Sequence, residues 1–141
     1  MDRLKIEHFE RDHKQPFPKF RSLSGDDCEE IRAALARTVG LAEDADGIRL
    51  LKVLDETARD TKANPCDSSF RLGQWRHLFK PTVLINWRRF QEIDEMRFED
   101  LSAYFDDIWF QVSDDIEIFD RSFKCILLVR HWCAVRLVLF N

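Results

Sequence analysis

Short runs of β-branched and aromatic residues fill the last quarter of the chain, and such residues favour the pleated surface of a sheet. The runs cover residues 108–112, 116–119, 124–131 and 135–140. Short polar side chains at residues 113–115 and 120–122 separate the first three runs and favour turns. The pattern therefore predicts an antiparallel meander that ends in a hairpin.

The last two runs pair in a definite register if Trp132 and Cys133 form a two-residue loop. In that register Val129 faces Arg136, and both faces of the hairpin are largely apolar. Strands with two apolar faces are covered on both sides, so we expect this hairpin at the centre of the sheet. Trp-Cys is poor chemistry for a two-residue loop, which leaves a longer loop as the alternative.

The first half of the chain has helical periodicity instead. Ser24 precedes a carboxylate by three residues, as in a helix N-cap, and Gly40 suits the left-handed end of the same helix. A second helix is expected to begin after Asp44 or Asp46 and to end before Pro65. The first half therefore predicts two helices.

The middle of the chain connects these helices to the meander. Residues 81–87 predict a strand, with Pro81 tolerated at its first position. Apolar residues at intervals of three predict a helical turn or a wide loop at residues 88–97, and residues 98–105 predict a short helix. The whole pattern predicts one α+β domain over residues 1–141, with N-terminal helices packed on a C-terminal antiparallel sheet.

Composition narrows the class of protein. Apolar residues make up 45% of the chain, which is enough for a core, and the net charge is −4. This acidic balance argues against nucleic acid as a partner, because binding to phosphates requires a basic surface. The chain has no apolar run long enough to span a membrane, and residues 1–14 lack the apolar stretch of a secretory signal. We therefore expect a cytoplasmic protein with no membrane partner.

The cysteines and glycines exclude several chemistries. In the cytoplasm the four cysteines are expected to be reduced, buried, small apolar residues. Cys125, His131 and Cys133 offer a zinc site as the alternative, but their spacing matches no familiar ligand set. The isolated glycines exclude a phosphate-binding loop, and no catalytic signature is present. We therefore expect no cofactor, metal or catalytic residue; an enzyme that gathers His77 or His131 with distant carboxylates is the alternative.

The charge distribution indicates a binding surface. Residues 92–120 contain eleven acidic residues and one basic residue, and residues 121–141 contain four basic residues and no acidic one. Such an acidic segment could dock on a basic protein surface; an ordinary solvated surface of turn residues and caps is the alternative. The candidate partner-binding residues are Asp106, Asp107, Trp109, Asp114, Asp115, Glu117 and Asp120.

The sequences YFDDIWFQVSDDIEIFD and LINWRRFQEID lie in a stretch, residues 80–138, that resembles small acidic bacterial immunity-type proteins of toxin–immunity systems. The resemblance implies a stoichiometric inhibitor that binds a cognate toxin, such as a nuclease with a basic cleft. The chain departs from those proteins at Trp132 and Cys133, where they have a polar turn. A non-toxin adaptor or a phage-encoded inhibitor would share the acidic surface. The oligomeric state does not follow from the sequence.

Overall fold

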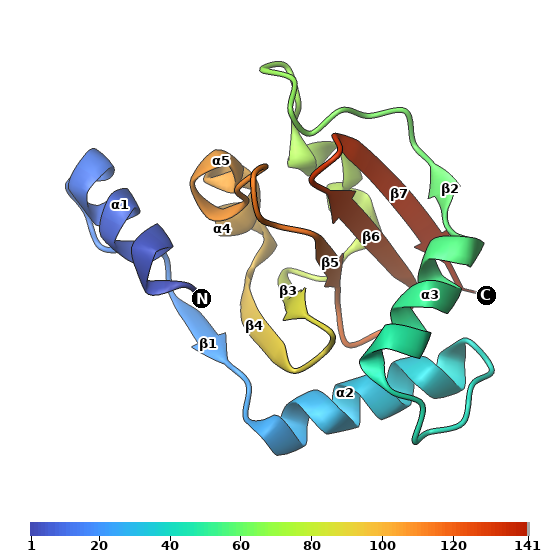
Figure 1. Cartoon of the computed structure of the whole chain (residues 1–141). Helices are drawn as coiled ribbons and strands as arrows, with labels where there is room; N and C mark the ends of the chain where they lie inside the picture. The colour runs from blue at the N-terminus through green and yellow to red at the C-terminus, as the bar shows by residue number, and fades with distance from the viewer. Residues whose placement is uncertain (141) are drawn as a thin grey trace.

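The computed structural model describes residues 1–140, in which helices surround one sheet (Figure 1). The first half contains α1 (Arg3–His13), β1 (Phe20–Ser22), α2 (Gly25–Thr38), α3 (Gly47–Thr57) and β2 (Arg59–Asp60). The second half contains the 3-10 helix η1 (Leu72–Leu78), β3 (Thr82–Arg88), β4 (Glu92–Arg97), α4 (Phe98–Ala103), α5 (Phe105–Ile108), β5 (Ile116–Phe119), β6 (Cys125–Arg130) and β7 (Ala134–Leu139). None of the helices within residues 1–140 has the length and apolar character needed to cross a membrane.

The seven strands form one antiparallel sheet in the order β1-β4-β3-β5-β6-β7-β2. The predicted strands at residues 81–87, 116–119, 124–131 and 135–140 are confirmed as β3, β5, β6 and β7. The N-terminal half adds β1 at one edge of the sheet and β2 at the other. The α+β class predicted from the pattern is therefore confirmed, and the β6–β7 hairpin lies inside the sheet.

Helices cover both faces of this sheet, which explains why β6 is buried along its whole length. Leu127 and Val129 point to the face covered by η1, α4 and α5, whereas Ile126 and Leu128 point to the face covered by α2 and α3. Successive side chains of a strand point to opposite faces, so a strand between two layers is mostly apolar on both faces. The continuous apolar run of β6 is the consequence.

The helices on the second face begin where the sequence predicts. The side chain of Ser24 accepts a hydrogen bond from the backbone N–H of Asp27 and caps α2, and Asp46 caps α3 by accepting from Arg49 N–H. Gly47, the first residue of α3, lies against the backbone of Arg89, where a Cβ atom would come within 2.1 Å of the carbonyl oxygen. This close contact joins the start of α3 to the β3–β4 turn and requires glycine.

Two predictions about the middle of the chain are wrong. Residues 92–97 form a strand, β4, and not a helical turn or loop. The alternation of apolar and polar residues along β4 is not visible in the sequence, because Asp94 is polar and yet is buried on the same side as Met96. Its carboxylate accepts a hydrogen bond from Trp87 Nε1 at 2.8 Å. The run at residues 108–112 is not a strand, because Phe105, Ile108 and Trp109 have helical spacing and are buried at the end of α5.

The hairpin register also differs from the two-residue loop. Arg130 pairs with Ala134, so the β6–β7 loop contains three residues, His131, Trp132 and Cys133. Cys133 has a positive φ of 65° and donates its backbone N–H to Arg130 O at 3.0 Å. The extra residue shifts the pairing by one position and moves each side chain of β7 to the opposite face from the one predicted. The longer-loop alternative is the one that occurs.

Candidate functional site

Three of the seven predicted partner-binding residues do not lie on the surface of the protein. Trp109, Glu117 and Asp120 have exposed fractions of 4%, 2% and 3%, so the expectation that a partner meets these side chains on the surface is wrong. Asp120 accepts hydrogen bonds from the backbone N–H groups of Lys80 and Ser122, at 2.7 and 2.8 Å, and holds the β5–β6 turn. Its role is that of a turn residue, as in the alternative interpretation.

Glu117 belongs to a buried polar group beneath α3. Its carboxylate accepts from Asn86 Nδ2 at 2.6 Å and forms an ion pair with Arg130, whose second nitrogen reaches Asp55 of α3 at 3.1 Å. Burial raises the pKa of Glu117, and the guanidinium of Arg130 opposes that rise. The group joins three strands of the sheet to α3, so its carboxylates are structural.

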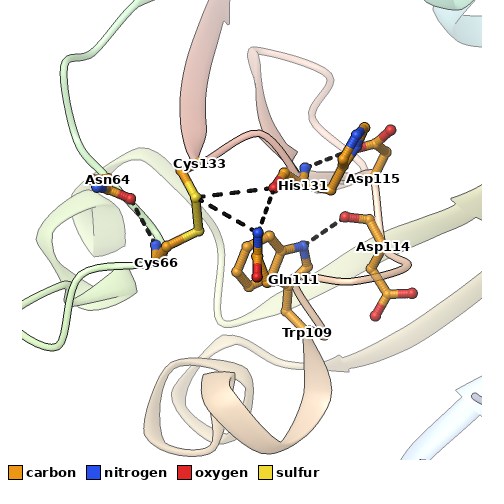
Figure 2. Close-up of a disulfide and its surroundings, with 8 residues drawn as sticks. All are labelled: Asn64, Cys66, Trp109, Gln111, Asp114, Asp115, His131 and Cys133. Carbon is orange, nitrogen blue, oxygen red and sulfur yellow. Dashed lines mark hydrogen bonds and ion pairs between the residues drawn. A yellow bond between two sulfur atoms is a disulfide. The ribbon is translucent and has the colours of Figure 1, made fainter.

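Asp114 is also used inside the protein. Its carboxylate forms an ion pair with the buried Lys5 of α1 at 2.5 Å and accepts from the backbone N–H of Phe110 at 2.8 Å. Its carbonyl accepts from Trp109 Nε1 at 2.9 Å, so the indole faces inward (Figure 2). Asp107 forms an ion pair with His13 at 3.0 Å. These contacts tie α1 to the α5–β5 loop.

Asp106 and Asp115 remain exposed. The carboxylate of Asp115 accepts from the backbone N–H of His131 at 2.7 Å and lies 2.8 Å from His131 Nδ1 (Figure 2). Within residues 1–140, no hydrogen bond or ion pair involves the carboxylate of Asp106, although the neighbouring Asp107 has one. Of the seven predicted partner-binding residues, these two carry carboxylates that the fold leaves on the surface.

A disulfide between Cys66 and Cys133 contradicts the expectation of four reduced cysteines. The segment between β2 and η1 runs along β7 to the β6–β7 loop, where it places Cys66 beside Cys133 (Figures 1 and 2). The sequence does not predict this pair, because Cys66 and Cys133 are 67 residues apart and meet only in the folded chain. Cys28 and Cys125 are free and buried, as predicted for small apolar residues. No group of metal ligands occurs among the described residues, the zinc candidates included.

Three loops meet at this disulfide, and we call them together the clamped end: residues 63–67, 110–115 and 131–133. Besides the disulfide, Gln111 Nε2 donates to His131 O at 3.1 Å and Asp115 holds His131, so each loop is tied to the hairpin tip (Figure 2). Each loop also carries its own internal hydrogen bonds, such as Cys66 N–H to Asn64 Oδ1 at 2.9 Å. The clamped end is fixed although it contains no regular secondary structure.

Two large apolar side chains are exposed on the clamped end. Val112 is 91% exposed and Trp132 is 59% exposed. Neither residue is among the predicted partner-binding residues, because Val112 lies in a run that predicts a strand and Trp132 in a predicted turn. The unusual turn chemistry of Trp132-Cys133 was the one local signal that pointed to this place. Exposed apolar groups on a fixed loop are typical of binding surfaces.

A shallow, open hollow lies between two of these loops and has a volume of about 340 Å³. It is lined by Pro65, Cys66, Asp106, Trp109, Phe110, Gln111 and Val112. The surface of the hollow is about equally polar and apolar, and Asp106 is the one charged residue in its lining. It therefore combines an apolar wall, a covalently fixed edge and a single carboxylate.

Of the two histidines named in the enzyme alternative, His77 and His131, the second contacts Asp115 at the exposed tip of the hairpin. The sulfur atom nearest to it in sequence, that of Cys133, is in the disulfide and is therefore not a thiolate nucleophile. The contact between His131 and Asp115 thus fixes the hairpin tip.

Comparison with protein-family models, curated proteins and solved structures finds no match for this chain. The class of function is therefore inferred from the residues of the clamped end.

Proposed function

We propose that the chain is a stoichiometric protein-binding inhibitor of the immunity type, which neutralises a toxin and contacts it through the clamped end. The observation that carries this proposal is the exposed indole of Trp132 on a hairpin tip that a disulfide fixes. Tryptophan is enriched among the residues that dominate binding energy at protein interfaces, because a rigid ring buries a large area when it meets a partner.

The fixed geometry of the clamped end favours binding. A flexible loop loses conformational entropy when a partner orders it, whereas a loop that is already ordered loses little. The disulfide at Cys66 and the bond from Asp115 to His131 order these loops before any contact is made. A surface of this kind suits tight, one-to-one recognition.

The charge of the clamped end supports a basic partner. Asp115 of the clamped end and Asp106, which lies just outside it in α5, are exposed, as are the apolar side chains of Val112 and Trp132. Carboxylates at the rim of an apolar contact accelerate association with a basic surface and repel an acidic one. A nuclease toxin presents such a surface in its substrate cleft, and the resemblance of residues 80–138 to immunity-type proteins favours the same class.

The test is co-expression of the chain with each toxin encoded beside its gene, with host survival and the stoichiometry of the complex as readouts. We expect a one-to-one complex and survival with the parent chain. Trp132→Ala should raise the Kd by about tenfold or more. Ile48→Ala is the matched control, because Ile48 is 57% exposed on α3 and Trp132 is 59% exposed.

Three results would contradict the proposal. Failure of every neighbouring toxin to bind would remove the immunity function. A folded Trp132→Ala variant that binds and protects like the parent would remove the clamped end as the contact surface. A one-to-one complex that leaves the toxin active would assign the chain to the adaptor class instead.

A further inference from the structure

We infer that the hollow beside the disulfide receives one arginine or lysine side chain of the protein partner, with the cation at Asp106 and the aliphatic stem along Phe110 and Val112. The inference rests on the proposed function, because it assigns a chemical group of the partner to one place on the clamped end. The hollow is lined on one side by residues 65–66 and on the other by residues 109–112.

The carboxylate of Asp106 carries the charge argument. It is exposed, and within residues 1–140 it has no cationic partner, whereas Asp107 is paired with His13 and Asp114 with Lys5. The neighbouring Asp114 is thus neutralised by a lysine and Asp107 is bonded to a histidine, whereas Asp106, the one charged residue in the lining of the hollow, has no such partner within residues 1–140. A cation from a protein partner would supply a counter-charge.

The apolar residues in the lining of the hollow favour a long basic side chain over a free cation. Lysine and arginine bury their methylene stems on apolar surface and keep the charged group at its edge. Phe110 and Val112 provide apolar contacts in the lining of the hollow, and Asp106 provides the anion. An acidic or phosphate group would be repelled by Asp106, and a purely apolar side chain would leave that carboxylate facing it without a partner.

The disulfide sets the width of the hollow. Cys66 forms part of one wall and is bonded to Cys133. Gln111, in the opposite wall, donates its side-chain amide to His131 O, two residues before Cys133. Both walls are therefore attached to the same hairpin tip, so the spacing between them is fixed before a partner arrives.

A probe experiment tests this site without the partner. N-acetyl-argininamide is titrated into isotopically labelled protein, and amide shifts are followed by NMR, with N-acetyl-norleucinamide as the uncharged probe. We expect shifts centred on residues 65–66, 106 and 109–112 with the arginine probe only. Asp106→Asn should weaken that response about fivefold or more, whereas Asp44→Asn, at an exposed carboxylate outside the clamped end, should leave it unchanged.

The outcomes separate this inference from the proposed function. Arginine shifts that lie elsewhere, that survive Asp106→Asn, or that the norleucine probe reproduces would overturn the arginine site. A toxin complex that depends on Trp132 but not on Asp106 would overturn it as well and leave the proposed function standing. Absence of any toxin complex, together with arginine shifts abolished by Asp106→Asn, would support the site and remove the proposed function.

Discussion

Cys66 and Cys133 lie 67 residues apart in the sequence, yet their Cα atoms are 5.4 Å apart and their sulfur atoms are bonded. The bond attaches the segment that follows β2 to the β6–β7 hairpin tip (Figure 2), and Trp132 of that tip is exposed. It therefore links the stability of the fold to the arrangement of the candidate binding surface. Both consequences are measurable.

Loss of the disulfide should destabilise the protein. Cys66→Ser opens a long covalent loop, and we expect the free energy of unfolding to fall by about 2–4 kcal/mol, because the unfolded chain regains conformational freedom. Urea denaturation of the oxidised parent, the reduced parent and the variant measures the effect. The reduced parent and the variant should agree, and a variant as stable as the oxidised parent would contradict the structure.

The thiol content should be two, not four. Denatured, unreduced protein should react with a thiol reagent at Cys28 and Cys125 only, and reduction should expose Cys66 and Cys133 as well. In the native protein neither free thiol should react near neutral pH, because burial raises the pKa of Cys28 and raises that of Cys125 to about 11. Mass spectrometry after alkylation counts the labels, and four labels without reduction would contradict the disulfide.

The buried Glu117 should give a pH-dependent contribution to stability. Its pKa in the folded protein is raised from the ordinary value of 4.5 by burial, so the folded state holds the proton more tightly than the unfolded state. The contribution of Glu117 to the free energy of unfolding is fully present below the ordinary pKa of 4.5, and it is lost as the pH rises through the pKa of the folded state. The parent should therefore lose stability relative to Glu117→Gln as the pH increases, as measured by denaturation at several pH values.

Glu95 provides a control, because its contribution to stability should change with pH in the direction opposite to that of Glu117. Partial burial would raise its pKa, but hydrogen bonds from Arg21 and Arg121 lower the value below the ordinary 4.5. Its contribution is therefore present above that pH and is lost as the pH falls. Relative to Glu95→Gln, the parent should lose stability toward acid, and equal pH profiles for the two glutamine variants would contradict this assignment.

Lys5 should be a structural residue despite its charge. It is 3% exposed, forms an ion pair with Asp114, and lies with Nζ 3.5 Å from the centre of the Phe110 ring. Lys5→Met leaves the carboxylate without its cation, and we expect a loss of about 3 kcal/mol in the free energy of unfolding. Arg3→Met on the same helix breaks an exposed pair with Glu7 and should change stability little. Similar losses in both variants would contradict the buried pair.

Local patterns predicted the elements whose signals are short-range. Ser24 and Asp46 cap their helices through bonds that span three residues, and these starts are correct. The apolar run of β6 is also correct, because burial on both faces leaves a continuous pattern that needs no knowledge of the neighbouring strands. The α+β class follows from such elements, since apolar faces must be covered by another layer.

Only the tertiary structure decided which carboxylates are on the surface. Asp115 and Glu117 are two residues apart, yet Asp115 is exposed in the loop before β5 and Glu117 is buried against Arg130. Sequence composition counts both as equal negative charges, whereas their roles depend on partners from β6 and its loop. Of the eleven acidic residues in 92–120, the fold buries Asp94, Glu117 and Asp120 and leaves Glu92, Glu99, Asp106 and Asp115 exposed.

The sequence by itself determined the starts of α2 and α3, the runs of β3, β5, β6 and β7 and the class of fold, because these depend on the side chains of a few consecutive residues. The tertiary structure decided the strand β4, the hairpin register and the pairing of Cys66 with Cys133, which depend on distant segments meeting. Register in particular is set by cross-strand packing and loop length together, and one added loop residue reverses the faces of β7. The clamped end exists only through such contacts.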